Sequence, residues 1–370
     1  MTKRDIIQGE VIFQYLYDLG GDIDLEKVET IYGKMPSEHV IETTKTTPKY
    51  ISLKSAMLTC TLNPLKANVF GEELEIKKSL RVYAVGATAI EYRVPFSGTI
   101  DELILFSMPF QIQIGKKTTH LREDSEETKK TAKKHLASAI GEQYEEEKEP
   151  EEYTVFCITK KVDSLNDKRT IAALIRGEKD PTKLSKEEVA DTTKTSLSYT
   201  HEDKIYVDWD GAVVIEPSGK YEDVLMTIEL ALLQLLELRS YDHLLDKKID
   251  ETYTETKKII SGRMYLMGSE LTKMTFDLAR IRIEVTELVE KTMNITKFMG
   301  DWYLAKLYDT LAKKLHIKDW HSSVIRKLDA MEELYSMASD RSDTRQMNLL
   351  EILIIVLIVL EISLAALGIM

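Results

Sequence analysis

The distribution of proline along the chain limits the fold more than any other sequence feature. All eight prolines lie at or before Pro217, and residues 218–370 contain none. Proline lacks a backbone donor and clashes with the preceding turn, so helix interiors exclude it. We therefore predict that the C-terminal part is essentially all helix and that the architecture changes near residue 217.

Residues 1–217 predict a mixed α/β head, which makes the expected fold class α+β. Runs rich in β-branched and aromatic residues at 9–20, 79–96, 153–159 and 204–217 predict strands, the second forming a hairpin that turns near 84–88. Short helices are expected at 23–33 and 98–107. The highly charged stretch at 122–152 predicts an exposed helix followed by an acidic loop.

The head carries no motif of a known chemistry. It lacks a glycine-rich phosphate loop, an HExxH pair and a nucleophile elbow, and Cys60 and Cys157 have no metal-ligand spacing. The net charge of -12 and the absence of a dense basic run argue against a direct nucleic-acid site. We predict no enzyme, no catalytic residue, no metal and no cofactor.

Residues 218–347 predict a helical stem with a coiled-coil seam. Apolar residues at alternating spacings of three and four form a narrow stripe typical of such a seam. The seam residues are Met264, Met267, Leu271, Met274, Leu278, Ile281, Val285, Leu288 and Ile295. Asp277 and Arg282 flank it and could pair across a parallel dimer. The seam could equally face the helix expected from residue 224 onward, as a hairpin within one chain, and both alternatives stay open.

Residues 348–370 predict a single transmembrane helix that anchors the chain by its tail. The 22 residues from Leu349 are almost all apolar, enough at ~1.5 Å per residue to cross the ~30 Å hydrocarbon layer. Arg341 and Arg345 precede this segment, so the positive-inside rule places the preceding bulk in the cytoplasm. We expect a single-pass cell-membrane protein whose residues 349–370 contact lipid.

Glu361 lies deep in this segment, where a charge is costly. On a helix it shares a face with Ala365 and Gly368, and small residues beside a polar one are typical of a contact between membrane helices. We expect this face to support a homo-oligomer. The alternative is a lone protonated acid tolerated in lipid.

The chain resembles the Required for Meiotic Nuclear Division family, a group of membrane proteins of unknown function. The likeness rests on residues 9–29, 81–98, 224–251 and 301–335, and on the ending at 349–362, where Glu351 and Glu361 occupy the family's acidic positions. The resemblance implies a membrane-anchored, oligomer-forming protein without known catalytic residues. Mitochondrial relatives are linked to support of translation, but the chain lacks an arginine-rich transit segment, which indicates a prokaryotic member.

Two functions follow from these features. The first is a tail-anchored membrane scaffold or tether, which self-assembles through its stem and presents a cytosolic head to a protein or ribosome partner. The alternative is a membrane-tethered enzyme or small-ligand sensor with its site in residues 1–217. A pocket with converging polar residues in the head would favour the second.

Overall fold

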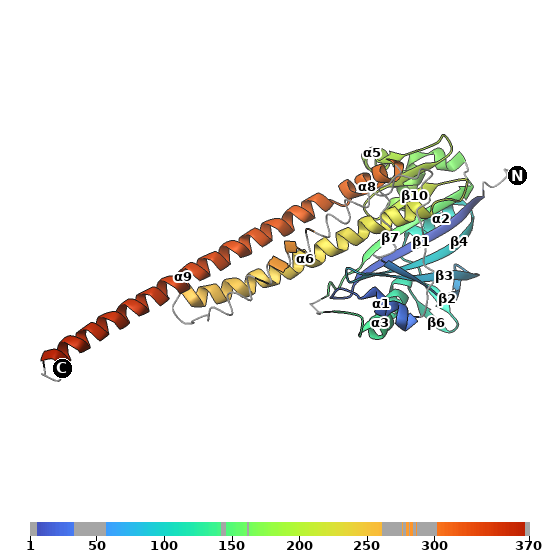
Figure 1. Cartoon of the computed structure of the whole chain (residues 1–370). Coiled ribbons are helices and arrows are strands. Elements are labelled where there is room, and N and C mark those ends of the chain that lie inside the picture. The colour runs from blue at the N-terminus through green and yellow to red at the C-terminus, as the bar shows by residue number, and fades with distance from the viewer. Residues whose placement is uncertain are drawn as a thin grey trace. The chain divides into compact units, whose positions relative to one another are not determined.

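The computed structural model describes residues 6–32, 57–141, 146–160, 163–260 and 302–366, together with residues 276, 279, 280, 282, 283 and 286 (Figure 1). The chain divides into two compact units. Unit 1 comprises Met1–Ser240 and Leu288–Trp320, and unit 2 comprises Tyr241–Glu287 and His321–Met370. The mixed α+β fold predicted from the sequence is confirmed, because unit 1 is built on a 10-stranded sheet with helices around it.

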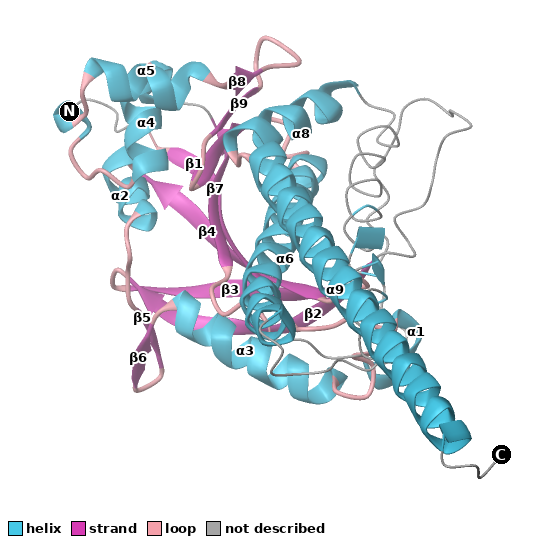
Figure 2. Ribbon diagram, turned by 90° about the vertical axis from the view of Figure 1, so that its left-hand side faces the viewer, coloured by secondary structure: helices cyan, strands magenta, loops and turns pink. Residues whose placement is uncertain are grey.

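The sheet is antiparallel except where β7 and β10 pair in parallel. Its strand order is β6-β5-β2-β3-β4-β1-β7-β10-β9-β8, so β6 and β8 form the two edges (Figure 2). The strands are β1 (Ile7–Asp18), β2 (Met57–Val69), β3 (Glu72–Tyr83), β4 (Ala87–Gly98), β5 (Ile112–Ile114), β6 (Lys117–Thr119), β7 (Glu151–Lys160), β8 (Ser196–Leu197), β9 (Lys204–Val207) and β10 (Gly211–Ile215).

The helices follow and interrupt these strands. Those wholly in unit 1 are α1 (Leu25–Tyr32), α2 (Ile100–Ile104), η2 (Leu105–Ser107), α3 (Leu121–Leu136), η3 (Asp163–Asn166), α4 (Lys168–Arg176), η4 (Pro181–Lys183), α5 (Lys186–Lys194) and α8 (Trp302–Lys314). Two longer helices, α6 (Glu222–Ile260) and α9 (Ile317–Ala366), continue into unit 2.

Strand alternation gives the sheet two different faces. On β1, Phe13 and Tyr15 belong to the apolar core that includes Phe106 and Leu121, from the segments that follow β4. Gln14, which points the opposite way, donates through Nε2 to Oε2 of Glu229 on α6 at 3.2 Å. Since successive strand side chains alternate between faces, the first turns of α6 cover one face and α2, α3 and α4 cover the other.

The hairpin predicted near 84–88 is present, since β3 ends at Tyr83 and β4 begins at Ala87. Its turn depends on Gly86, which has a φ of 99°. A Cβ at Gly86 would lie 2.6 Å from the carbonyl oxygen of Gly21. Both the backbone conformation and the close approach therefore require glycine here.

From Glu222 onward, the continuous described segments 222–260 and 302–366 are helical apart from the turn at 315–316, as the sequence predicts. Helix α6 has 39 residues and α9 has 50. Within unit 2, Lys327 Nζ of α9 lies 2.8 Å from Asp242 and 2.6 Å from Asp246 of α6. These two carboxylates of α6 thus share one lysine of α9.

The predicted seam from Met264 to Ile295 lies outside the described residues. Arg282, which could pair with Asp277 across a parallel dimer, forms ion pairs with two carboxylates of α9 within the chain. Its Nη2 lies 2.7 Å from Asp329 and 3.0 Å from Glu332. This guanidinium is therefore used within one chain.

The predicted membrane helix at 348–370 needs correction, together with the tail-anchored, membrane-protein class that it implied. In the described part of the chain, no helix is long and apolar enough to cross a membrane. Glu351 and Glu361 interrupt the apolar sequence of this segment, and a charge in the hydrocarbon layer is costly.

The predicted contact of Glu361, Ala365 and Gly368 is not tested by the structure. Residues 361 and 365 belong to α9, but their side chains lie outside what is described, as does the whole of Gly368. The cytoplasmic placement of the preceding bulk depended on the membrane helix and stays an untested prediction.

Candidate functional site

A cleft of about 440 Å³ opens in unit 1 between the sheet, the segment after α2 and the start of α3. We call it the aromatic cleft. Phe13, Tyr15, Phe106 and Phe110 supply its aromatic surface. Its volume falls within the ~300–1,000 Å³ typical of sites for small molecules.

The register of two strands builds the floor of the aromatic cleft. On β1 and β7, Phe13 pairs with Thr154, and Tyr15 pairs with Glu152. Because residues two apart on a strand point to the same face, all four side chains lie on one side of the sheet. Phe13 and Tyr15 are 6% and 8% exposed, so the floor is firmly packed.

The segment 105–110 forms the aromatic wall. A capping box between Thr99 and Glu102 starts α2, and η2 then brings Phe106 into the core. The Phe110 ring centroid lies 5.5 Å from that of Phe13 and 5.4 Å from that of Phe106. These tilted contacts, a favourable arrangement for aromatic pairs, connect the wall to the floor.

Close packing from α4 also holds this wall. Gly177 ends α4 with a φ of 65°, and a Cβ there would lie 2.7 Å from the carbonyl oxygen of Ser107. The Ser107 hydroxyl donates to the carbonyl of Ile104 at 2.6 Å. The aromatic wall is therefore held by packing against the end of α4 as well as by the contacts between its rings.

His120 lines the aromatic cleft at the start of α3. Its Nδ1 lies 2.8 Å from the carbonyl oxygen of Phe110. A carbonyl oxygen only accepts hydrogen bonds, so Nδ1 is the donor in this contact. The same contact ties the start of α3 to the aromatic wall.

The rim of the cleft carries more carboxylates than cations. Arg122 pairs through Nη1 with Glu152 at 2.8 Å and through Nη2 with Glu149 at 2.7 Å. Burial raises the pKa of Glu152, an effect that Arg122 opposes only in part. A hydrogen bond from Thr119 lowers the pKa of Glu123, the second rim carboxylate.

The phenol of Tyr15 supplies a donor below this rim. Burial, followed by the neighbouring charge of Glu152, raises the pKa of Tyr15 well above its ordinary value. The hydroxyl therefore stays protonated at physiological pH. The aromatic cleft thus combines aromatic surfaces, the carboxylates of Glu123 and Glu152, and one neutral donor.

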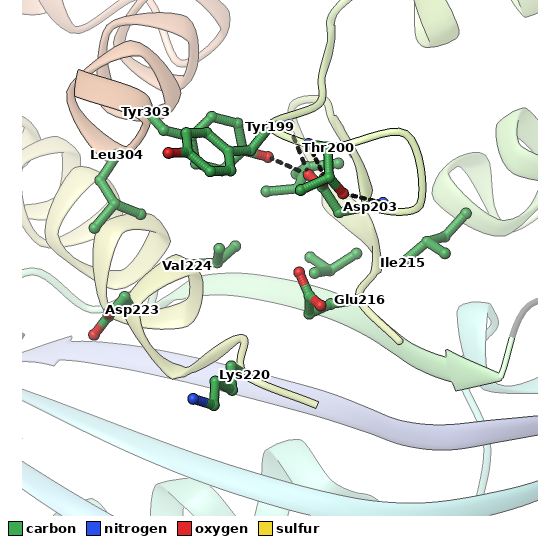
Figure 3. Close-up of a pocket in the computed structure, with 12 residues that line it drawn as sticks. Tyr199, Thr200, Asp203, Ile215, Glu216, Lys220, Asp223, Val224, Tyr303 and Leu304 are labelled. Atoms are coloured by element: carbon green, nitrogen blue, oxygen red, sulfur yellow. Dashed lines mark hydrogen bonds between the residues drawn. The ribbon is translucent and has the colours of Figure 1, made fainter. Parts of the chain in front are cut away.

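A second hollow, the tyrosine pocket, has a volume of about 180 Å³ (Figure 3). Figure 3 shows Tyr199 and Tyr303 side by side next to Asp203, and their ring centroids are 5.6 Å apart. Asp203 accepts hydrogen bonds from Tyr199 N at 2.8 Å and from Tyr303 Oη at 3.2 Å.

The carboxylates of the tyrosine pocket mainly fasten its own loops. Burial would raise the pKa of Asp203, but hydrogen bonds from Thr200 and Tyr199 outweigh it and hold that pKa low. Glu216 accepts from the backbone and hydroxyl of Ser218 at 3.0 and 2.7 Å. The aromatic cleft is the larger of the two and has more aromatic rings in its lining, so it is the stronger candidate for a ligand.

A buried ionic network lies on the opposite face of the sheet, under α6. Arg81 of β3 donates through Nη2 to Glu91 at 2.6 Å and through Nε to Glu229 at 2.5 Å. Burial alone would raise the pKa of Glu91, but Arg81 and Arg93 lower it to about 2. All these groups are engaged with each other, so the network fixes α6 on the sheet.

Sequence reasoning named none of the residues of the aromatic cleft. The described lining of the cleft includes neither a seam residue nor Glu361. A usable signal was present at 106–110, where two phenylalanines flank a proline close to His120. Among the residues described, no group of three or more His, Cys, Asp or Glu side chains is arranged to hold a metal ion.

The fold and the cleft define an α+β domain built on one large sheet. The chain belongs to the family of the MJ0711 N-terminal domain, whose family model, described as "Uncharacterized protein MJ0711, N-terminal domain", matches residues 8–222. It is 27% identical over 226 residues to uncharacterized protein MJ0711 of Methanocaldococcus jannaschii, covering 60% of this chain and 68% of that protein. No solved structure matches the chain.

This match corrects the resemblance drawn from the sequence. The family shown is that of the MJ0711 N-terminal domain, and nothing found points to the Required for Meiotic Nuclear Division family. The residues of the aromatic cleft all fall within the matched range 8–222. The tyrosine pocket extends beyond it, to Asp223 and Leu304.

Proposed function

We propose that this protein is a small-ligand receptor and that the aromatic cleft binds a planar aromatic amine. The observation that carries the proposal is an acceptor-rich rim above an aromatic floor. Phe13 and Phe110 offer ring faces for stacking. Glu123 and Glu152 offer carboxylate acceptors at the edge.

The charge of the rim decides which class of ligand fits. Arg122 is the cation of the lining, and it is already paired with Glu149 and Glu152. An anionic ligand would have to separate these pairs and approach Glu123. A ligand ammonium meets two carboxylates, and opposite charges attract more strongly in a cleft than in bulk water.

Two probes of matched shape and opposite charge test this proposal. Tryptamine and indole-3-acetate share an indole ring, but one carries an ammonium group and the other a carboxylate. We expect isothermal titration calorimetry of the full chain to show tryptamine binding at least about tenfold more tightly, a difference of ~1.4 kcal/mol. Equal binding of the two probes, or no binding of either, would contradict the proposal.

Substitutions assign the binding to the aromatic cleft. Phe110→Ala should weaken tryptamine binding by roughly 2- to 10-fold, since an aromatic pair contributes ~0.5–1.5 kcal/mol beyond its burial. Glu152→Gln should weaken tryptamine binding and spare that of indole-3-acetate. Glu216→Gln, in the tyrosine pocket, is the matched control and should change neither.

Self-assembly is a second candidate function, and one observation favours it. The apolar side chains at 352–360 of α9 are 49–57% exposed, and monomeric proteins rarely leave such a continuous apolar area uncovered. Assembly would allow the head to present its surface to a protein partner. Light scattering of the full chain measures its mass and tests self-assembly. A monomeric mass would contradict this second function.

A further inference from the structure

The tip of the β2–β3 hairpin carries a bulky residue where a small one is expected. Val69 pairs with Glu72, so Phe70 and Gly71 form a two-residue turn, with φ values of 54° and 95°. Turns with two positive φ values favour Asn, Asp or Gly at both positions. Phenylalanine at a positive φ is an outlier that needs a compensating contact.

The turn itself does not supply the reason for phenylalanine. Asn68 Oδ1 accepts a hydrogen bond from Gly71 N at 3.0 Å, which closes the turn through backbone and Asn68 alone. A Cβ at Gly71 would meet nothing within 4 Å, so the tip is open. An asparagine at position 70 would fit this backbone better than phenylalanine does.

The compensating contact is with the aromatic wall. The Phe70 ring centroid lies 5.1 Å from that of Phe106 and 5.4 Å from that of Phe110. Phe70 is nevertheless 49% exposed, so its ring covers the wall from outside without belonging to the core. A continuous ring contact therefore runs from Phe70 through Phe110 to Phe13 on the cleft floor.

We propose that Phe70 is a positioning residue for the aromatic cleft, holding the Phe110 ring in place against a bound ligand. The proposal rests on the function proposed above. Phe110 otherwise sits on a short connecting segment with an exposed Met108 and Pro109 before it. Phe70 supplies the outer support that this segment lacks, and the unfavourable backbone at position 70 is retained for that contact.

Three variants of the full chain separate positioning from stability. Phe70→Asn removes the ring and relieves the turn, Phe70→Tyr keeps the ring, and His316→Asn is the matched control. His316 is the other described non-glycine residue with a positive φ, 52°, and it lies outside the lining of the cleft. Thermal melting and the tryptamine dissociation constant are measured for each.

We expect Phe70→Asn to weaken tryptamine binding by about fivefold or more, as the loss of one aromatic contact allows, with little change in melting temperature. Phe70→Tyr should bind as the wild type does, and so should His316→Asn. Wild-type affinity in Phe70→Asn would overturn the proposal, because a purely structural residue would leave affinity unchanged.

A ligand-free measurement distinguishes failure here from failure of the proposed function. If wild-type protein binds neither indole probe, the proposed function fails. The ¹⁹F spectrum of protein labelled with fluorophenylalanine then decides the role of Phe70, with the Phe110 resonance assigned from Phe110→Tyr. A shifted or broadened Phe110 resonance in Phe70→Asn supports positioning, and an unchanged resonance overturns it.

Discussion

Arg122 and Glu152 meet at the rim of the aromatic cleft, with Nη1 and Oε1 2.8 Å apart. Arg122 comes from the first turn of α3, and Glu152 from β7, whose register with β1 places it beside Tyr15. The pair neutralises the positive charge of the guanidinium, so the net charge of the rim is negative. This relationship is the basis for expecting a cationic ligand.

Tryptamine binding should depend on pH through Glu152. Burial places the folded pKa of Glu152 above its ordinary value of 4.5, and only the ionised carboxylate attracts an ammonium group. Tryptamine should therefore bind most tightly at pH values above that raised pKa. Its affinity should fall as the pH drops through the pKa and Glu152 becomes protonated. Calorimetric titrations between pH 4 and 8 measure this, and Glu152→Gln should lose the dependence. A profile identical in the variant would exclude Glu152.

Arg81→Met should destabilise unit 1 strongly. The substitution leaves the carboxylates of Glu91 and Glu229, which are 2% and 0% exposed, without their main cation. Breaking a buried ion pair by removing one partner costs about 3–5 kcal/mol. Urea unfolding measures the change. Lys27→Met, which removes an exposed pair with Asp24, is the control and should cost less than about 1 kcal/mol.

Glu237→Gln should stabilise the protein at pH 8. Glu237 of α6 is 1% exposed, and its Oε1 has no hydrogen-bond partner among the described residues. Burial, together with the charges of Asp18 and Asp22, raises the pKa of Glu237 well above 4.5. Removing the ionisable group should raise the free energy of unfolding at pH 8 by at least about 1 kcal/mol, since one pKa unit corresponds to ~1.4 kcal/mol.

The sign of the pH dependence gives a second check on Glu237. Because its folded pKa exceeds its unfolded value, the folded state binds a proton first as the pH falls. This group should therefore make the wild type more stable as the pH drops from the folded pKa toward 4.5. Comparing unfolding curves with Glu237→Gln isolates this contribution. The exposed Glu26→Gln on α1 is the control. If the free energy of unfolding of Glu237→Gln changes with pH as steeply as that of the wild type, the assignment is contradicted.

Two glycines with similar backbones should respond differently to alanine. Gly71 and Gly86 have φ values of 95° and 99°, but only at Gly86 would the new Cβ approach a backbone atom, Gly21 O, at 2.6 Å. Gly71→Ala should cost about 1–2 kcal/mol from its backbone alone. Gly86→Ala should cost more than Gly71→Ala in urea unfolding. Equal losses would show that the β3–β4 turn moves freely away from Gly21.

The sequence predicted the local elements better than the site. The proline distribution correctly indicated helices in the described C-terminal segments, and a run of β-branched and aromatic residues indicated the hairpin between β3 and β4. The membrane helix was a wrong prediction, since composition was weighed over the whole 22-residue ending and the interruptions at Glu351 and Glu361 were read as adaptations to lipid.

The aromatic cleft could not be predicted because its parts are distant in sequence. Phe13, Phe110 and Glu152 come from three segments, and only the pairing of β1 with β7 and the packing of 105–110 bring them together. The same holds for Arg81, Glu91 and Glu229, which looked like ordinary charged positions along two strands and a helix.

The most direct test of the account is where tryptamine binds. Intermolecular nuclear Overhauser effects between the indole protons and assigned aromatic rings of the full chain would locate the ligand. We expect the indole protons to show contacts to Phe13 and Phe110. Contacts to Tyr199 and Tyr303 instead, or none to any ring, would contradict the assignment of the aromatic cleft as the binding site.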